Sequence, residues 1–215
     1  EADAARRDFT MNALYADPES GAVFDWFGGL TDLADRRVRF IGDPYTRIAE
    51  DHLRILRFFR FHARFGDAPD GPGLDACTDR ANDLMALSRE RIAAELLKLL
   101  VAKGAVPVVA LMIERGILRP VLPEITEVPA FEALADAEAR AGVAPDAIRR
   151  LASLIPFDAA ESVGARLRLS NADRKRLIAA HEGPGSEGAR ALAYRVGPAI
   201  ALDRLLLAGE SVEAL

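Results

Sequence analysis

The 215-residue sequence is poor in the features that mark secreted and membrane proteins. It holds one cysteine, Cys77, so an internal disulfide is excluded and a reducing cytoplasm is the expected compartment. No apolar run reaches the roughly 18 residues that a membrane span needs, so no contact with a membrane is predicted. Repeats, heptad arrays and low-complexity tracts are also missing. We therefore expect a folded cytoplasmic protein.

Neither end of the sequence carries a boundary signal. The start has no initiator Met and no apolar signal region. The end, at residues 211–215, follows a helical stretch without a stop signal. We expect both ends to have been cut from a longer protein.

Lysine is scarce, and of the 28 basic residues only those at positions 98, 103 and 175 are lysines. Arginine binds phosphate and base edges through a rigid fork, but a GC-rich genome produces the same bias and explains most of the count. The net charge of −5 argues against a protein that coats itself in nucleic acid. Any RNA contact would have to be local, at a clustered basic face.

Apolar periodicity predicts a mainly α protein. Two short strands are predicted at residues 22–26 and 37–41, and a short helix at 9–15. Asp43 and Pro44 are typical of a helix start, and a helix or helix pair is predicted from residue 44 to 65, followed by a loop at 67–73. Further helices are predicted at 74–82, 88–103, 106–115, 129–141, 146–154, 159–168, 172–180, 187–194 and 198–208.

The first candidate site is a charged cluster before the helix at 9–15. Arg6 and Arg7 present guanidinium forks that suit triphosphate oxygens, and Asp8 can accept a hydrogen bond from a ribose hydroxyl. A solvated charge cluster with a helix cap is the alternative explanation.

The second candidate site is the polar face of the helical segment at 44–65. Asp51 and Arg54 are three positions apart, so in a continuous helix they are neighbours on its surface. An Asp accepts from an exocyclic amine and an Arg donates to a ring nitrogen or carbonyl, so the pair can read the edge of cytosine or adenine. Arg57 and Arg60, further along, can hold phosphates. The alternative is an exposed face with a local Asp–Arg ion pair.

These segments occur in an ordered series that resembles the class II tRNA nucleotidyltransferase and poly(A) polymerase family, which includes the CCA-adding enzymes. The string at 6–14 is similar to the family's ribose and triphosphate motif. Asp25, Gly28, Gly29, Asp32 and Arg39, followed by 42–44, are similar to its head-to-neck hinge motif. Residues 50–61 are similar to its nucleotide template, and 88–100 to the neck motif that follows. The resemblance covers residues 3–125.

The resemblance implies roles for five nucleotide-binding residues. Asp51 and Arg54 would form the amino-acid template that selects CTP and ATP over UTP and GTP. Arg7, Arg57 and Arg60 would contact the incoming nucleotide, mainly at its phosphates.

Four further residues receive supporting roles from the same resemblance. Asp8 would assist at the ribose, and Glu50 would hold the template in place. Arg91 and Glu95 would be structural residues of the neck.

The resemblance also implies the domain organisation. The fold would be the remnant of an α/β nucleotidyltransferase head with two short strands, followed by an all-helical neck and body. Residues 1–66 would hold the end of the head and the template helix, and 67–125 the helical neck, a region that binds RNA and nucleotide. Residues 126–215 would form a helical body that is truncated at its C-terminal end.

Chemistry in this family needs two metal ions, expected to be Mg²⁺, held by an Asp-x-Asp pair in the head. The sequence has no such pair at a suitable place, so no catalytic and no metal-binding residue is predicted in it, and the chain alone is expected to be inactive. His52, His62 and His181 lack metal-ligand spacing and are interpreted as non-ligands.

The predicted function is addition of CMP and AMP, from CTP and ATP, to tRNA or another RNA 3′ end, with release of pyrophosphate. Two alternatives stay open. One is a poly(A) polymerase, or a CC-adding or A-adding enzyme of the same family. The other is a non-catalytic helical module that binds tRNA or a protein. The sequence does not indicate an oligomeric state.

Overall fold

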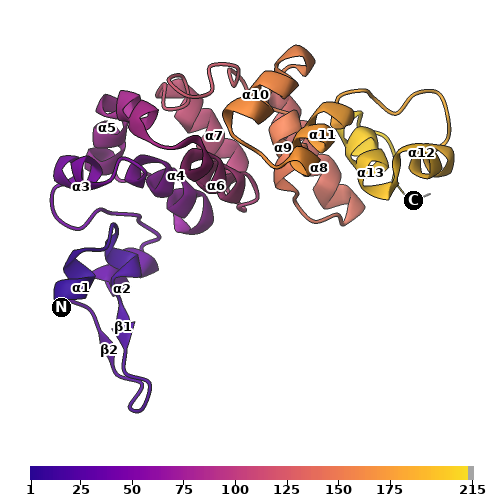
Figure 1. The fold of residues 1–215 in the computed structure, drawn as a ribbon. Helices are drawn as coiled ribbons and strands as arrows, with labels where there is room; N and C mark the ends of the chain where they lie inside the picture. The colour runs from indigo at the N-terminus through magenta and orange to yellow at the C-terminus, as the bar shows by residue number, and fades with distance from the viewer. Residues whose placement is uncertain (213–215) are drawn as a thin grey trace.

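The computed structural model describes residues 1–212 as an elongated series of helices. Figure 1 shows a hairpin of β1 (Tyr15–Ala16) and β2 (Val23–Phe24) projecting at one end, with α12 (Ala189–Val196) and α13 (Pro198–Leu207) at the other. The mainly α fold with two short strands agrees with the sequence prediction. The predicted body includes residues 213–215, which lie outside the described residues.

The N-terminal segment departs from prediction in detail. Its elements are α1 (Ala2–Ala5), the 3-10 helix η1 (Thr10–Asn12), the antiparallel β1–β2 pair and α2 (Gly29–Ala34). The prediction of a strand at 37–41 is wrong, because Phe40 forms only an isolated bridge to Phe9 and no continuous strand pairing. The strand that pairs with β2 is instead β1, which begins at the last residue of the helix predicted at 9–15.

Asp32 connects three parts of this segment. Its side chain is fully buried and forms ion pairs with Arg37 (2.5 Å) and Arg39 (2.8 Å). The Thr10 hydroxyl donates a third bond to it (2.6 Å). Since a buried carboxylate is stable only when it is paired and hydrogen-bonded, these contacts fix η1 and residues 37–39 around α2. The hinge motif thus has a structural explanation.

Gly29, the first residue of α2, is expected to tolerate no side chain. A Cβ there would lie 2.3 Å from the backbone oxygen of Thr10, which cannot move aside cheaply. Gly29→Ala is therefore expected to lower the free energy of unfolding by about 1–3 kcal/mol, the usual effect of overpacking. Gly71, the first residue of α5 (Gly71–Asp79), has no atom within 4 Å of such a Cβ, so Gly71→Ala is the matched control in urea unfolding. Equal effects of the two substitutions would contradict this steric explanation.

The middle of the chain is a bundle of α3 (Pro44–Glu50), α4 (Arg54–Phe65), α5, the 3-10 helix η2 (Ala81–Ala86), α6 (Arg89–Leu100) and α7 (Ala105–Glu114). Asp43 caps α3 by accepting from the N–H of Thr46 (2.7 Å). The segment from residue 44 to 65 is a helix pair, broken at Asp51, whose backbone is extended. The loop predicted at 67–73 is too long, because Asp70 caps α5 and that helix begins at Gly71.

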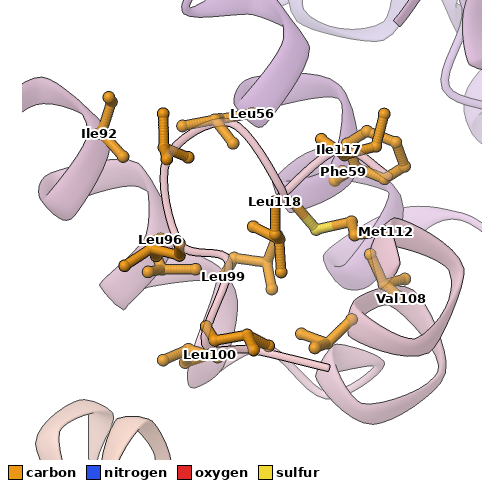
Figure 2. Close-up of a cluster of buried hydrophobic side chains, with 14 of the residues drawn as sticks. Leu56, Phe59, Ile92, Leu96, Leu99, Leu100, Val108, Met112, Ile117 and Leu118 are labelled. Atoms are coloured by element: carbon orange, nitrogen blue, oxygen red, sulfur yellow. The ribbon is translucent and has the colours of Figure 1, made fainter. Parts of the chain in front are cut away.

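Apolar side chains of α4, α6, α7 and the turn after α7 form the core that supports this bundle. Figure 2 shows Leu56 and Phe59 of α4 among side chains of α6 and α7, with Ile117 beside Phe59 and Leu118 in the middle of the cluster. Their helical spacing turns one stripe of each helix inward, and burial of that stripe is the main stabilising term. The opposite face of α4 therefore stays free for polar groups.

The helices after residue 125 continue the array as α8 (Pro129–Ala141), α9 (Ala147–Ala152), the 3-10 helix η3 (Phe157–Ala159), α10 (Ala160–Arg166), α11 (Asn171–Ala180), α12 and α13. Buried charges join four of them. Arg149 of α9 lies 2.7 Å from Glu138 of α8 and 3.2 Å from Asp203 of α13. Arg176 of α11 also pairs with Asp203 (2.7 Å), so ion pairs fix the packing of this part.

Candidate nucleotide-binding site

The two residues of the predicted template lie on either side of the break between α3 and α4. Asp51 ends α3 in an extended conformation, and Arg54 is the first residue of α4. The prediction that they are neighbours on one continuous helix surface is therefore wrong. The alternative, a local ion pair between them, does not form either, because each has another partner.

Asp51 is held from a different helix. Its Oδ2 accepts a hydrogen bond from Arg91 of α6 (2.8 Å), and its Oδ1 accepts from the backbone N–H of Leu53 (3.1 Å). The carboxylate remains about one third exposed, which leaves it accessible to a ligand. The predicted structural residue Arg91 thus lies in direct contact with the predicted template.

Arg54 is held by three groups. It forms an ion pair with Glu50, the last residue of α3, and donates to the carbonyl of Arg47 (2.9 Å). Its second terminal nitrogen donates to the carbonyl of Arg6 (3.1 Å), which joins α4 to the N-terminal segment. Glu50 also pairs with Arg47 (3.0 Å), so this carboxylate orients two guanidinium groups.

Arg57 pairs with Asp8, a residue 49 positions earlier in the chain. The carboxylate of Asp8 is buried and also accepts from the Asn12 amide (2.6 Å). Burial acts to raise the pKa of Asp8, but the bonds from Arg57 and Asn12 outweigh it, and the pKa lies below its usual value.

The Asp8–Arg57 pair is expected to make stability depend on pH. Because the pKa of Asp8 is lowered by folding, its contribution is complete above the unfolded pKa of about 3.9 and is lost as the pH falls through the folded value. Asp8→Asn should therefore destabilise the protein at pH 7 and have a smaller effect below about pH 3. Urea unfolding of both proteins at the two pH values tests this. A difference that does not vary with pH would contradict it.

Arg60 forms an ion pair with Glu95 of α6 (2.5 Å), whose carboxylate is almost fully buried. The aromatic ring of Phe61 lies 4.7 Å from the Arg60 guanidinium and 5.5 Å from that of Arg57. A ring at this distance attracts a cation and restricts its orientation. Phe61, which directly follows Arg60 in the sequence, therefore positions both arginines.

Arg7 lies apart from the arginines of α4. Its side chain is half exposed and contacts Asp3 and the Tyr15 hydroxyl, each at 3.3 Å. The structure thus gathers eight of the nine predicted residues on the polar face of α4 and leaves the ninth beside β1. The eight form four pairs of one arginine and one carboxylate, so their formal charges cancel.

Two further residues of the site, Arg47 and Asn12, were not predicted from the sequence. They orient Glu50 and Asp8. The spacing of Arg47 three residues before Glu50 is a usable signal for such a pair. Asn12 lies four residues after Asp8, but the turn of η1 that brings them together had no clear pattern.

No group of three or more His, Cys, Asp or Glu side chains within residues 1–212 could hold a metal ion. The carboxylates of the site do not suit one, since each is neutralised by an arginine. In the same part of the chain, no helix is long and apolar enough to cross a membrane.

Two family descriptions match segments on either side of the α3–α4 break. Residues 1–39 match the Poly A polymerase head domain, and residues 74–128 match the probable RNA and SrmB-binding site of polymerase A. The second segment includes α6, which supplies Arg91 and Glu95 to the site.

Curated relatives extend this similarity. The chain is 34% identical over 177 residues to CCA tRNA nucleotidyltransferase 1, mitochondrial, of Mus musculus, covering 80% of the chain and 40% of the relative. It is 38% identical over 126 residues to Poly(A) polymerase I of Haemophilus influenzae, covering 59% of the chain and 28% of the relative. The chain thus spans 40% or less of the length of these relatives.

Solved structures show the same fold. The Thermotoga maritima CCA-adding enzyme complexed with tRNA superposes with a TM-score of 0.70 at 20% identity, covering 96% of this chain and 56% of that one. A tRNA-processing enzyme with CTP gives a TM-score of 0.76 at 20% identity, covering 98% and 64%.

One chain thus carries a segment that matches a polymerase head and a segment that matches the RNA-binding site of such polymerases. The chain belongs to the family of tRNA nucleotidyltransferases and poly(A) polymerases, which includes the CCA-adding enzymes. Nucleotidyl transfer in this family uses a divalent metal ion.

Proposed function

We propose that the full-length protein adds CMP and AMP, from CTP and ATP, to the 3′ end of tRNA and releases pyrophosphate. The observation that carries this proposal is the set of four arginine–carboxylate pairs along the polar face of α4. Three of these pairs draw a partner from another segment of the chain, so the site is assembled by the fold. Similarity to CCA-adding enzymes supports tRNA as the substrate.

Base recognition is assigned to Asp51 and Arg54. The Asp51 carboxylate would accept a hydrogen bond from the exocyclic amine of cytosine or adenine, and Arg54 would donate to the adjacent ring nitrogen or carbonyl. UTP and GTP present a carbonyl where CTP and ATP present this amine, and two acceptors face to face repel. Because Arg91 and Glu50 hold the two side chains in place, little ordering is needed when a nucleotide binds.

The phosphates of the nucleotide are assigned to Arg57, Arg60 and Arg7. Arg57 and Arg60 follow Arg54 at successive steps of three residues, about 4.5 Å along the helix axis each. Guanidinium groups bind phosphate oxygens in pairs of parallel hydrogen bonds, and they neutralise charge on the triphosphate. Asp8, which accepts bonds from Arg57 and Asn12, is assigned to the ribose hydroxyls.

Three parts of the chain receive roles under this proposal. Residues 1–66 contain the nucleotide-reading face, 67–125 the neck that supplies Arg91 and Glu95, and 126–215 the helical body. Mg²⁺ is proposed as the metal ion from the family resemblance alone. Residues 1–212 contain no group of three or more His, Cys, Asp or Glu side chains that could hold it, and we derive no step of the reaction through it.

A cytoplasmic location is also proposed. The single cysteine, Cys77, is buried and free, which suits a reducing compartment. Some relatives are named as mitochondrial enzymes, so the location needs a direct test. Detection of the native protein in the cytosolic fraction of its own cells is the expected result, and its confinement to a membrane-bound organelle would contradict the proposal.

The decisive experiment is incorporation by the full-length protein. It would be given tRNA lacking its terminal CCA, Mg²⁺ and each labelled nucleotide in turn, with and without a chelator. Incorporation of C and then A, lost on chelation, is the expected result. Long A tails alone would instead establish a poly(A) polymerase. No incorporation of any nucleotide would overturn the enzymatic proposal and favour a non-catalytic module that binds tRNA or a protein.

A further inference from the structure

A basic pocket lies where the C-terminal turns of α4 and α6 meet. Its volume is about 360 Å³, and it is lined by Arg60, Arg64, Lys98, Val101, Ala102 and Lys103. Only Arg60 belongs to the candidate nucleotide site. Two of the three lysines in the whole sequence contribute to this one pocket.

The pocket is positively charged, although the protein as a whole is negative. Four cationic side chains line it, and the carboxylate that contacts them is Glu95, 2.5 Å from Arg60 and 3.6 Å from Lys98. Arg64 and Lys103 form no ion pair within the part of the chain that is described, and both are exposed. In a chain of net charge −5, such a cluster attracts anions to one point on the surface.

The backbone fixes the two ends of the pocket against each other. The N–H of Gly104 donates to the carbonyl of Ala63 (2.8 Å), which joins the turn after α6 to the last turn of α4. A Cβ at Gly104 would lie 2.8 Å from the same oxygen, so glycine permits this close approach. Lys103 and Arg64 are the chain neighbours of these two residues, and their spacing is therefore set by the fold.

The position of the pocket indicates which anion it takes. Arg64 lies ten residues beyond Arg54 on α4, about 15 Å along the axis, while Arg57 and Arg60 cover the interval between. A nucleotide with its base at Arg54 places its phosphates on those intervening arginines. The exposed side chain of Val101 adds an apolar surface, which suits the sugar of a polynucleotide.

We propose that this pocket binds phosphodiester groups of the RNA strand to which nucleotides are added. The proposal rests on the proposed function and locates one point on the path of the RNA. Its chemistry is the neutralisation of backbone phosphates by Arg64, Lys98 and Lys103, which does not depend on base sequence.

The test is RNA binding by the 215-residue chain and by the double variant Arg64→Gln/Lys103→Gln. The matched control is Arg140→Gln/Lys175→Gln, which removes one Arg and one Lys from exposed positions on α8 and α11. The dissociation constant of a labelled tRNA lacking CCA would be measured by fluorescence anisotropy from 50 to 300 mM NaCl. CTP binding to the same proteins would be measured in parallel.

The pocket variant is expected to bind the RNA about tenfold more weakly at 0.1 M NaCl, and its salt slope should fall by about one for each phosphate that is no longer neutralised. The control should bind as the parent does, and CTP affinity should not change. Unaltered RNA binding by the pocket variant would overturn the proposal, and would leave an acidic protein surface as the pocket's partner. Loss of CTP affinity in the variant would overturn it too, because the pocket would then hold the triphosphate.

The experiments can refute the RNA-binding pocket and the enzymatic function independently of each other. Weaker RNA binding by the pocket variant, together with a full-length protein that incorporates no nucleotide, would retain the pocket and refute the enzymatic function. Selective incorporation together with unaltered RNA binding would do the reverse.

Discussion

Replacement of Arg149 by Ala is expected to lower the free energy of unfolding by about 3 kcal/mol, the lower end of the range for breaking a buried ion pair. Arg149 is almost fully buried and pairs with Glu138 and Asp203, which are also buried. Its loss leaves two carboxylates in a poorly solvated environment. Arg150 and Arg176 still contact them at 2.8 and 2.7 Å, which is why the lower end applies.

Urea unfolding followed by circular dichroism measures this effect. Arg140→Ala is the control, since Arg140 is an exposed residue of α8 outside the network, and its expected effect is within about 0.5 kcal/mol. Arg149→Lys should recover only part of the loss, because an ammonium group cannot bridge two carboxylates as a guanidinium does. A loss below about 1 kcal/mol for Arg149→Ala would show that the network adds little to stability.

Replacement of Asp51 or Arg54 by Ala is expected to relax base selection in the full-length protein. A correctly placed hydrogen-bonding pair contributes about 1–3 kcal/mol of discrimination, so the preference for CTP over UTP in kcat/KM should fall by about tenfold to a hundredfold. The ratio between the two nucleotides is the informative quantity, because it separates base reading from a general loss of activity.

Asp35→Ala and Arg119→Ala are matched controls, since both residues are exposed and lie outside the network on α4. Arg91→Ala distinguishes direct reading from positioning. It frees Asp51 without removing the carboxylate, so a partial loss of selectivity is expected. If the Asp51 and Arg54 variants lose activity equally for all four nucleotides, the assignment of the template is wrong.

Helix boundaries were predictable where a local signal sets them. Asp43 and Pro44 start α3, and Ser88 caps α6 by accepting from the backbone N–H of Arg91 (3.4 Å). α8 has the predicted bounds, 129–141. Such caps depend on contacts within one turn, which a sequence shows directly.

The sequence left open whether residues 44–65 form one continuous helix or a helix pair, and it did not place the break at Asp51. Residues 51–53 contain no glycine or proline, and the apolar periodicity continues through them. Arg91, from a helix that begins 38 residues later, holds the Asp51 side chain away from α3 and α4. A contact at this separation leaves no trace in local pattern, and the same holds for the isolated bridge between Phe40 and Phe9, which are 31 residues apart.

The pairings of the site divide in the same way. The Arg47–Glu50 contact follows from spacing by three within α3, whereas Glu50 and Arg54 meet across the break at Asp51. The pairing of Arg57 with Asp8, and of Arg60 with Glu95, spans 49 and 35 residues and required the tertiary structure. The resemblance to a family predicted which residues belong to the site. The structure was needed to show which of them pair with one another. The assigned roles of these residues stay predictions.

The pairing of charges along α4 affects the stability of the folded protein when no nucleotide is bound. Four guanidinium groups in one region would repel one another, and each additional cation would weaken the native state. Their carboxylate partners remove this repulsion. A bound triphosphate would replace carboxylates as the partner of the arginines. The free energy gained on binding would therefore be the difference between the arginine–phosphate and arginine–carboxylate interactions, which are similar in size. We expect modest affinity and rapid release of nucleotides, as the proposed cycles of addition would require, without the loss of native-state stability that often accompanies a functional site.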